Sequence, residues 1–363
     1  MDLPTRSCMS GPSLMDDSKI LVSLAVYQPN LEFLRAQLAS LAAQTLPCTL
    51  VAVIADGTSH DTVRGMATDL GLTCTLADPP APPLDPLRAF SFGLETALAL
   101  SSAPQDLFAF CDQDDVWHPT RLEAARARMI ETGAKLVHGD ARLVDGSGHL
   151  LHASMYAQEA RMRNPTLKHL FYRNVITGMA SLFDRDVAAL MTPIPVPLRK
   201  GFFLHDHWLG FVGALWPNGL AHLETPLIDY RQHGGNVVGA ATGAEAHPSP
   251  FTRAWLRRAR FRSAVGVYTA RLLRQRLADR GLLKDLSETD TILQRFASPG
   301  GGRAAVQDAQ EFKRRGHQES ARLALGCAAV RMMGGPNQTL LGTSLRLDDE
   351  TLTRFWTETE IRI

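Results

Sequence analysis

The chain has 363 residues, 45% of them hydrophobic, and its 38 basic and 37 acidic residues give a formal net charge of +1. The hydrophobic content excludes a disordered or fibrous protein, and the balanced charge argues against nucleic acid as a partner. Five scattered cysteines without a CxxC pair argue against a disulfide framework or a zinc site and favour a reducing compartment.

Neither end of the chain suggests export or membrane insertion. No apolar run approaches the roughly 20 residues that a membrane-spanning helix requires, and residues 1–18 lack the apolar core of a secretory signal. We therefore expect a cytoplasmic protein in which residues 1–18 form a flexible leader.

Predicted strands and helices alternate along the first third of the chain. The expected strands are 20–27, 50–55, 72–76 and 107–111, and the expected helices begin after Asn30 or cover 63–70 and 87–100. This order predicts an α/β fold with a doubly wound, mainly parallel sheet flanked by helices. Such sheets bind ligands outside the carboxyl ends of their strands.

An acidic cluster directly follows the fourth predicted strand, in the sequence FAFCDQDDVWHP. Asp112 and Asp114 are one residue apart and can both reach a hard cation, and Mg²⁺ or Mn²⁺ prefers oxygen ligands while leaving positions for phosphate oxygens. The cation would offset the repulsion between the carboxylates. Asp115 belongs to the same cluster but can also cap the next helix, and both interpretations stay open.

Six motifs follow one another between about residues 20 and 240: VSLAVYQPN, IADGTSHDT, DQDDVW, NVITGMASLFDRD, LHDHWLG and YRQHGGNVVG. In this order and spacing the chain resembles glycosyltransferase family 2, and specifically its bacterial rhamnosyltransferase-like branch. The resemblance implies the GT-A fold, a nucleoside-diphosphate sugar donor, a divalent cation (Mg²⁺ or Mn²⁺) and single displacement with inversion at the anomeric carbon. It also suggests dTDP-L-rhamnose as the donor and a growing surface glycan, free or lipid-linked, as the acceptor.

The resemblance assigns the donor side to the first half of this domain. Val26 and Tyr27 would cradle the nucleotide base together with Asp56, whose carboxylate accepts a hydrogen bond from the pyrimidine ring. Asp112 would face the ribose or reach the metal through water, and Asp114 would be the direct metal ligand. The family often has two acids in the turn around Asp56 and this chain has one, which leaves open the base that is bound.

The second half of the domain would supply the base and the acceptor pocket. Asp206 stands in the first turn of a predicted helix and would remove the proton from the acceptor hydroxyl, or it only caps that helix. Asn174 would bind a hydroxyl or close a turn, Gly178 would let a ligand approach the backbone, and Trp117 is assigned to the same pocket.

A late glycine-containing loop carries two further assignments. Arg231 would pair with phosphate oxygens through its forked donors. His233 would complete the metal shell or contact the phosphate, with a solvated turn residue as the alternative.

The expected domains are a glycosyltransferase domain (19–240, with a nucleotide-binding half at 19–118 and an acceptor half at 119–240) and a basic helical extension (241–363). In the extension, Phe261, Val265, Tyr268 and Leu272 recur at helical spacing on an arginine-rich helix. Its apolar stripe would dock on the main domain, or its arginines would contact an anionic membrane surface. Residues 334–363 receive no assignment.

Other functions fit parts of the pattern. A glycosyltransferase using another UDP- or GDP-sugar would keep the same motifs. A Mg²⁺-dependent nucleotidyltransferase or phosphohydrolase would also place acids at a strand end, but the glycine-rich loop with lysine and the DxT pattern of those enzymes do not follow these acids. A catalytically silent sugar-binding or scaffold protein could keep the fold.

Overall fold

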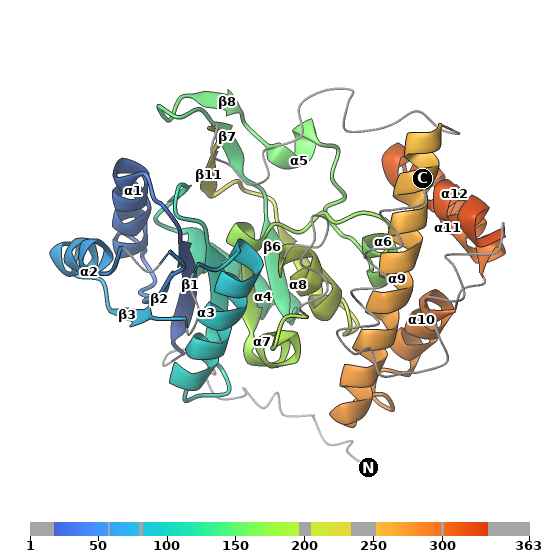
Figure 1. The fold of residues 1–363 in the computed structure, drawn as a ribbon, viewed down its shortest axis with the longest axis horizontal. Helices are drawn as coiled ribbons and strands as arrows, with labels where there is room; N and C mark the ends of the chain where they lie inside the picture. Colours follow the sequence, from blue (N-terminus) through green and yellow to red (C-terminus); the bar gives the residue numbers. More distant parts are fainter. Residues whose placement is uncertain are drawn as a thin grey trace, which may run out of the picture.

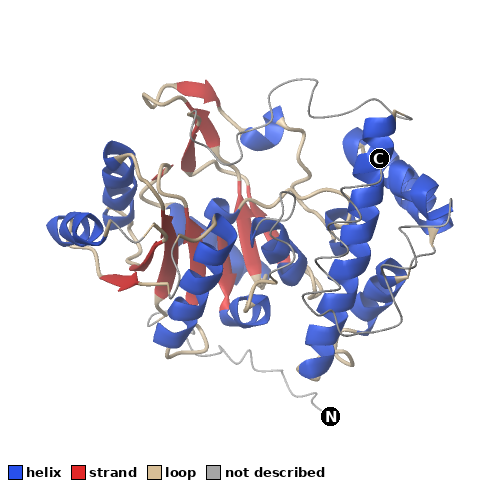
Figure 2. Cartoon of the chain, in the orientation of Figure 1, coloured by secondary structure: helices blue, strands red, loops and turns tan. Residues whose placement is uncertain are grey.

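A computed structural model describes residues 18–56, 59–79, 83–195, 205–233, 252–298 and 301–332. Almost all of the expected leader, the start of the expected extension at 241–251 and the unassigned segment 334–363 lie outside these residues. The described chain forms a central sheet covered by helices, a small second sheet at one end, and a group of helices α9–α12 at one side (Figure 1, Figure 2).

The central sheet has seven strands in the order β10-β6-β9-β4-β1-β2-β3. Their bounds are Leu220–Leu223 (β10), Leu136–Gly139 (β6), Ser181–Asp184 (β9), Leu107–Cys111 (β4), Ile20–Val26 (β1), Thr49–Ile54 (β2) and Cys74–Ala77 (β3). All neighbours pair in parallel except β9, which runs antiparallel to β4 and β6. The predicted doubly wound, mainly parallel α/β fold is therefore confirmed.

Helices cover both faces of this sheet because neighbouring residues of its strands point to opposite sides. On one face lie Leu31–Ala42 (α1), His60–Asp69 (α2) and Arg121–Thr132 (α4); on the other lie Pro86–Leu100 (α3), Arg185–Met191 (α7) and His205–Gly213 (α8). In β1, Leu21 packs in the core with α3 and α8, and Val22 packs in the core with α1 and α4. Both faces are buried, as the continuous apolar strands predict.

The second sheet ties together segments that are far apart in sequence. Its order is β5-β11-β7-β8, with bounds Val116–Trp117 (β5), Ile228–Arg231 (β11), Arg142–Val144 (β7) and Leu150–His152 (β8). Because β11 pairs with β5, the end of β11 lies beside the acidic cluster that precedes β5. Three short helices complete the domain: Met155–Gln158 (α5), Leu167–Leu170 (α6) and the 3-10 turn Gly178–Ala180 (η1).

The C-terminal extension consists of Arg253–Asp279 (α9), Ser287–Ala297 (α10), Gly302–Arg314 (α11) and Gln318–Met332 (α12). Docking of its apolar stripe is confirmed, since Val265 and Tyr268 are buried in the core shared with the sheet domain. In α11, Asp308 is buried, accepts a hydrogen bond of 2.7 Å from the Tyr172 hydroxyl, and forms ion pairs with Lys168 and Arg295. The extension is thus fixed to the segment that follows α6.

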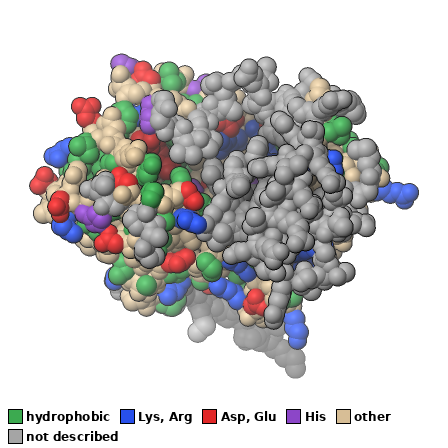
Figure 3. Space-filling view, in the orientation of Figure 1, with side chains coloured by type: hydrophobic (Ala, Val, Ile, Leu, Met, Phe, Trp, Pro, Cys, Tyr) green, Lys and Arg blue, Asp and Glu red, His purple; other side chains and the backbone are tan. Residues whose placement is uncertain are grey.

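Several arginines of α9 bind the protein itself. Arg276 Nη1 donates to the carbonyls of Leu190 and Met191 at 2.6 and 2.8 Å, and Arg274 Nε pairs with Asp290 at 2.6 Å. These contacts stabilise the carbonyl end of α7 and the packing of α10. Of the helices within the described ranges, none has the length and apolarity to cross a bilayer. Over the sheet half of the face in Figure 3, acidic and basic side chains are intermixed.

Two buried histidines lie at the edge of the sheet, on β6 and β10. His138 Nδ1 is 2.8 Å from the Tyr156 hydroxyl, which donates to the Val175 carbonyl at 2.6 Å. His222 Nδ1 is 3.5 Å from His138 Nδ1, and the Nε2 atoms of both rings are buried without a hydrogen-bond partner. Burial lowers the pKa of His138 well below its usual value and that of His222 to about 4. Both rings are therefore neutral in the folded protein.

We expect this pair to make the protein acid-labile. A histidine whose folded pKa lies below its unfolded value loses stability as the pH falls through the unfolded pKa near 6.5. The parent should therefore lose unfolding free energy between pH 7 and pH 5, and His222→Gln should make this loss smaller by about 2 kcal/mol. Urea denaturation at the two pH values measures it. His149→Gln, at a side chain that is 82% exposed, is the matched control; equal pH slopes in both variants would contradict the prediction.

Candidate functional site

The structure brings the predicted base and the predicted metal ligands to one place. Asp112 directly follows β4, and Asp206 lies in the first turn of α8. Helix α8 is held against β4 by His205, whose ring centroid lies 5.0 Å from that of Phe110 and 4.0 Å from that of Phe90. The negative charge of Asp206 helps raise the pKa of Asp112, as expected for carboxylates that share a site.

The acidic cluster is electrostatically unfavourable by itself. Burial, with Asp114 and Asp206 next, raises the pKa of Asp112 to about 7. Burial and the charges of Asp112 and Asp114 hold the pKa of Asp115 well above its usual range. A cation would relieve this repulsion, and carboxylate oxygens are the ligands that Mg²⁺ and Mn²⁺ prefer. Among the residues with described positions, no three metal-binding side chains stand ready around one point, so phosphate or water oxygens would have to complete the shell.

Asp115 does not cap the following helix, so that interpretation is wrong. Strand β5 intervenes, and Thr120 is the residue that precedes α4. Asp115 is instead fully buried, its Oδ1 accepts from the Arg231 backbone N–H at 3.1 Å, and its Oδ2 has no hydrogen-bond partner. Its carboxyl group joins the acidic cluster to the end of β11.

Gln113 is a site residue that the sequence did not indicate. Its side-chain amide donates to the Tyr27 carbonyl at 3.0 Å and accepts from the Tyr27 N–H at 2.9 Å. This pair of bonds fastens the acidic loop to the end of β1. A glutamine in an acidic loop carries no recognisable signal, because its partner is a main-chain group 86 residues earlier.

The predicted base-binding residues lie at the neighbouring strand ends. Asp56 follows β2 and accepts the backbone N–H of Gln28 at 2.9 Å, with Gln28 in the left-handed region at φ 42°. The Tyr27 side chain is 46% exposed and free to stack on a ring, whereas Val26 is buried and can offer only its main chain. Asp56 and Tyr27 thus border one surface beside the acidic cluster.

His233 and Arg231 approach the cluster from β11. His233 Nε2 lies 2.8 Å from Asp114 Oδ2, which brings this predicted pair of metal ligands together. Arg231 is 7% exposed; its Nε donates to the Asp114 carbonyl at 2.9 Å, its Nη1 donates to the Gly146 carbonyl at 2.9 Å, and its guanidinium lies 4.4 Å above the Phe33 ring. The contacts of Arg231 hold the acidic loop in shape, which differs from the phosphate contact expected of it.

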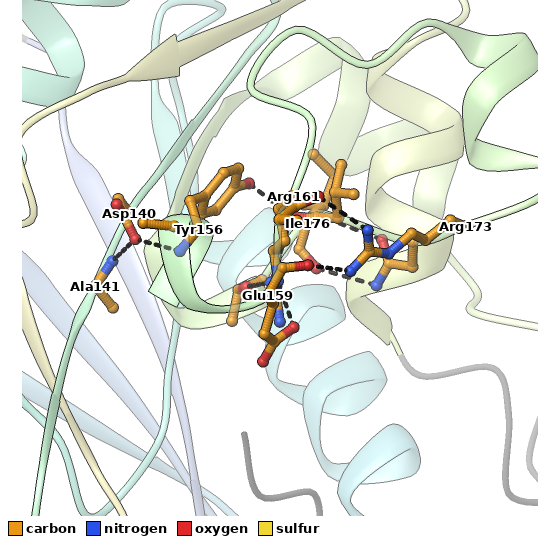
Figure 4. A network of polar contacts seen from close by, with 12 residues as sticks. Asp140, Ala141, Tyr156, Glu159, Arg161, Arg173 and Ile176 are labelled. Atoms are coloured by element: carbon orange, nitrogen blue, oxygen red, sulfur yellow. Dashed lines mark hydrogen bonds and ion pairs between the residues drawn. The ribbon is translucent and has the colours of Figure 1, made fainter. Parts of the chain in front are cut away.

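Asp206 has an environment suited to proton transfer. Burial raises its pKa to about 6, against a backbone hydrogen bond from His207 (2.6 Å to Oδ1), the positive charge of Arg161 and a hydrogen bond from the Asn174 side chain. Asn174 also closes its own turn, with its Nδ2 donating to the Ile176 carbonyl and its Oδ1 accepting from the Ile176 N–H, both at 3.0 Å. The Asn174 side chain thus lies beside Asp206 and lowers its pKa. Arg161, which no motif indicated, sits within the network of Figure 4.

Two residues predicted to contact the acceptor, Trp117 and Gly178, face the protein interior instead. Trp117 is 1% exposed, lies under the Arg121 guanidinium at 3.6 Å, and donates its backbone N–H to Ser40 Oγ at 3.0 Å. It is a core residue and cannot contact an acceptor. Beside Gly178, the space for a ligand is filled by His205, because a Cβ there would lie 2.4 Å from His205 Nε2. The missing side chain of Gly178 serves the packing of α8.

This packing yields a test of how α8 is positioned. Gly178→Ala should push the buried His205 ring and lower the free energy of unfolding by about 1–3 kcal/mol, because overpacking forces a core side chain out of place. The double variant Gly178→Ala/His205→Ala removes the obstructing ring and should be less destabilised than the sum of the two single changes. Urea denaturation of the parent, the two single variants and the double variant measures this. A single Gly178→Ala variant with parental stability would contradict the assignment.

The acidic cluster makes a second prediction, for stability without metal. A carboxylate whose folded pKa is about 7 costs stability as the pH rises above its unfolded value near 3.8. Asp112→Asn should therefore stabilise the metal-free protein at pH 8, on the order of 2 kcal/mol, and less at pH 5.

Thermal unfolding in EDTA measures this effect, with Asp61→Asn, at a side chain 99% exposed, as the control. Mn²⁺ should then stabilise the parent more than Asp112→Asn, because binding to the folded state raises stability. A less stable metal-free Asp112→Asn at pH 8 would contradict the argument.

Comparison with known proteins gives only distant structural likenesses. Residues 1–349 of S. aureus TarS in complex with UDP-GlcNAc are 14% identical, with 87% of this chain and 92% of that chain covered and a TM-score of 0.49. A mannosyltransferase from Pyrobaculum calidifontis in complex with GDP-Man and Mn²⁺ is 15% identical, covering 96% of this chain and 86% of that one, with a TM-score of 0.42. No protein-family model and no curated protein matches the chain. At these identities and TM-scores neither likeness assigns an activity.

Proposed function

We propose that this protein is an inverting, metal-dependent glycosyltransferase of the GT-A type, which moves a sugar from a nucleoside diphosphate to a hydroxyl group. The observation that carries the proposal is the meeting of two acidic elements, Asp112 with Asp114 after β4 and Asp206 at the start of α8. The charge of Asp206 acts directly on Asp112. The displacement of a diphosphate by an alcohol is a reaction that needs both a metal-binding acidic pair and a separate carboxylate base.

On the donor side, Asp114 and His233 would hold Mg²⁺ or Mn²⁺ directly, and Asp112 would reach the ion through water. When bound, such a cation supplies positive charge that stabilises the negative charge on the departing diphosphate. Tyr27 offers an exposed ring for the nucleotide base, and Asp56 offers a carboxylate at the same strand end. Gln113 and Arg231 keep the acidic loop in the shape that these contacts need.

On the acceptor side, Asp206 would take the proton of the acceptor hydroxyl as its oxygen bonds to the anomeric carbon. The bond from that carbon to the diphosphate oxygen breaks in the same step, and its electron pair leaves with the diphosphate. A pKa of about 6 leaves Asp206 ionised at neutral pH and still basic enough to accept the proton. Asn174 holds the carboxylate in place through its hydrogen bond.

The finer specificity rests on the six motifs that resemble the rhamnosyltransferase-like branch. We infer dTDP-L-rhamnose as the donor and a hydroxyl of a growing surface glycan, free or lipid-linked, as the acceptor. The reaction would take place in the cytoplasm, with the extension near the inner face of the membrane. A silent sugar-binding protein would keep donor binding without turnover, so a turnover assay separates the two functions.

Two substitutions should separate the two halves of the site. Asp206→Asn should preserve metal-dependent donor binding and lower transfer by about 10²–10⁴-fold, the range that a positioned general base contributes. Asp114→Ala should weaken donor binding in the presence of Mn²⁺ and leave metal-free binding little changed.

Calorimetric titration of dTDP-rhamnose, with and without Mn²⁺, and a transfer assay measure both effects. Asp61→Asn, at an exposed carboxylate of α2, serves as the control. If Asp206→Asn and Asp114→Ala both bound donor and turned over like the control, the proposed roles would be wrong.

A further inference from the structure

A basic cleft lies where the C-terminal extension meets the acceptor half of the domain. Its volume is about 480 Å³, within the range of small-ligand sites. The loop after α5 forms one side, and the turn between α11 and α12 forms the other. Every residue that lines it is neutral or basic, including Arg161, Arg163, Asn164, Arg315 and His317.

The arginines of the cleft differ in their exposure and in the ion pairs that they make within the protein. Arg161 is paired with Glu159 at 2.8 Å and is mostly buried. Arg315 is 57% exposed and has one ion pair, with Glu311 at 3.1 Å. Arg163 is exposed, and within the described ranges it makes no hydrogen bond or ion pair. Two guanidinium groups at the rim thus keep donors for a ligand, and forked donors of this kind bind carboxylate and phosphate groups.

The cleft adjoins the proposed base. Arg161 lines it, and its positive charge lowers the pKa of Asp206 while Asp206 raises the pKa of Arg161. Arg161 Nη1 also donates to Thr177 Oγ1 at 2.7 Å, beside the turn that packs on α8. Figure 4 shows Arg161 in one network of polar contacts with Tyr156 and Glu159. Arg161 thus connects the lining of the cleft with the surroundings of Asp206.

The extension gives the cleft its second wall, and buried contacts hold it there. The Lys168 and Tyr172 contacts to Asp308 join α11 to the domain, and Arg173 pairs with Glu319 of α12 at 2.9 Å. Arg315 and His317 follow directly on α11, so this docking sets their place. His317 remains neutral, because burial and the nearby Arg315 and Arg173 lower its pKa, and it can give a ligand one hydrogen bond.

From this geometry we infer that the acceptor is an anionic glycan, whose phosphate or carboxylate group is bound by Arg163 and Arg315 in the cleft while its hydroxyl faces Asp206. The inference rests on the proposed function and names the acceptor class. The donor diphosphate is placed elsewhere, at Asp112 and Asp114. The charge selects between acceptors, because a neutral glycan would leave Arg163 without a counter-charge and Arg315 with that of Glu311 alone, which Glu311 shares with Lys168.

The test compares three oligomeric probes of matched length on the full chain: an oligogalacturonate, an oligo(glycerol phosphate) and a neutral malto-oligosaccharide. Calorimetry at low and at 300 mM salt gives the affinities. We expect the parent to bind one or both anionic probes at least tenfold more tightly than the neutral one, with the preference falling as salt rises. The anionic probe that binds more tightly shows whether the cleft binds phosphate or carboxylate groups.

The double variant Arg163→Glu/Arg315→Glu should lose about tenfold or more in affinity for that probe and keep parental affinity for the nucleotide-sugar donor. Arg314→Glu, an exposed arginine that does not line the cleft, is the matched control and should change little. Equal binding of anionic and neutral probes by the parent, or a double variant that binds like the control, would overturn the inference.

Donor binding separates this outcome from failure of the proposed function. If the parent bound no nucleotide sugar and yet selected the anionic probe through Arg163 and Arg315, the cleft would stand as an anion site and the glycosyltransferase proposal would fall. If donor binding and turnover were present without any anion preference, only the acceptor class would be wrong.

Discussion

Repulsion among carboxylates in a partly buried site is the constraint on which this structure depends. Asp112, Asp114 and Asp115 follow one strand within four residues, and Asp206 adds its charge from another element. Water cannot screen these charges well, so Asp114 and Asp206 help raise the pKa of Asp112, and Asp112 and Asp114 help raise that of Asp115. The chain holds the loop in place with groups that carry no negative charge: the amide of Gln113, and the backbone and guanidinium of Arg231. A bound cation would relieve the repulsion that remains.

Different elements of the fold contribute different groups around this acidic cluster. The ends of β1, β2 and β4 supply main-chain and carboxylate groups at one sheet edge, where a nucleotide would lie. Helix α8 carries Asp206, the base in the proposed function, and the turn at Asn174 lies beside it. The extension stands behind that turn, joined to it by the buried bond between Tyr172 and Asp308. Arg276 of the extension binds carbonyls at the end of α7, and Arg274 pairs with Asp290 of α10, so these two arginines stabilise the docked extension.

The interpretations that needed correction share one cause. Trp117, Gly178 and Asp115 were assigned from their position in a motif, which says which residues are near a site along the chain but not which way each side chain points. In the fold Trp117 turns into the core, the space beside Gly178 holds His205, and Asp115 binds the Arg231 backbone. No sequence motif indicated Gln113 or Arg161. Each belongs to the site because of contacts with groups that are distant in sequence.

The sequence by itself determined the α/β order, the bounds of the main strands within about two residues, and the acidic cluster at the end of β4. It could do so because apolar period and strand-to-loop transitions are local properties of the chain. Only the tertiary structure decided that Asp206 approaches Asp112, that Asn174 lies beside it, and that the extension closes a basic cleft beside it. These are contacts between segments far apart in sequence, set by how helices pack on the sheet, and no local pattern encodes them.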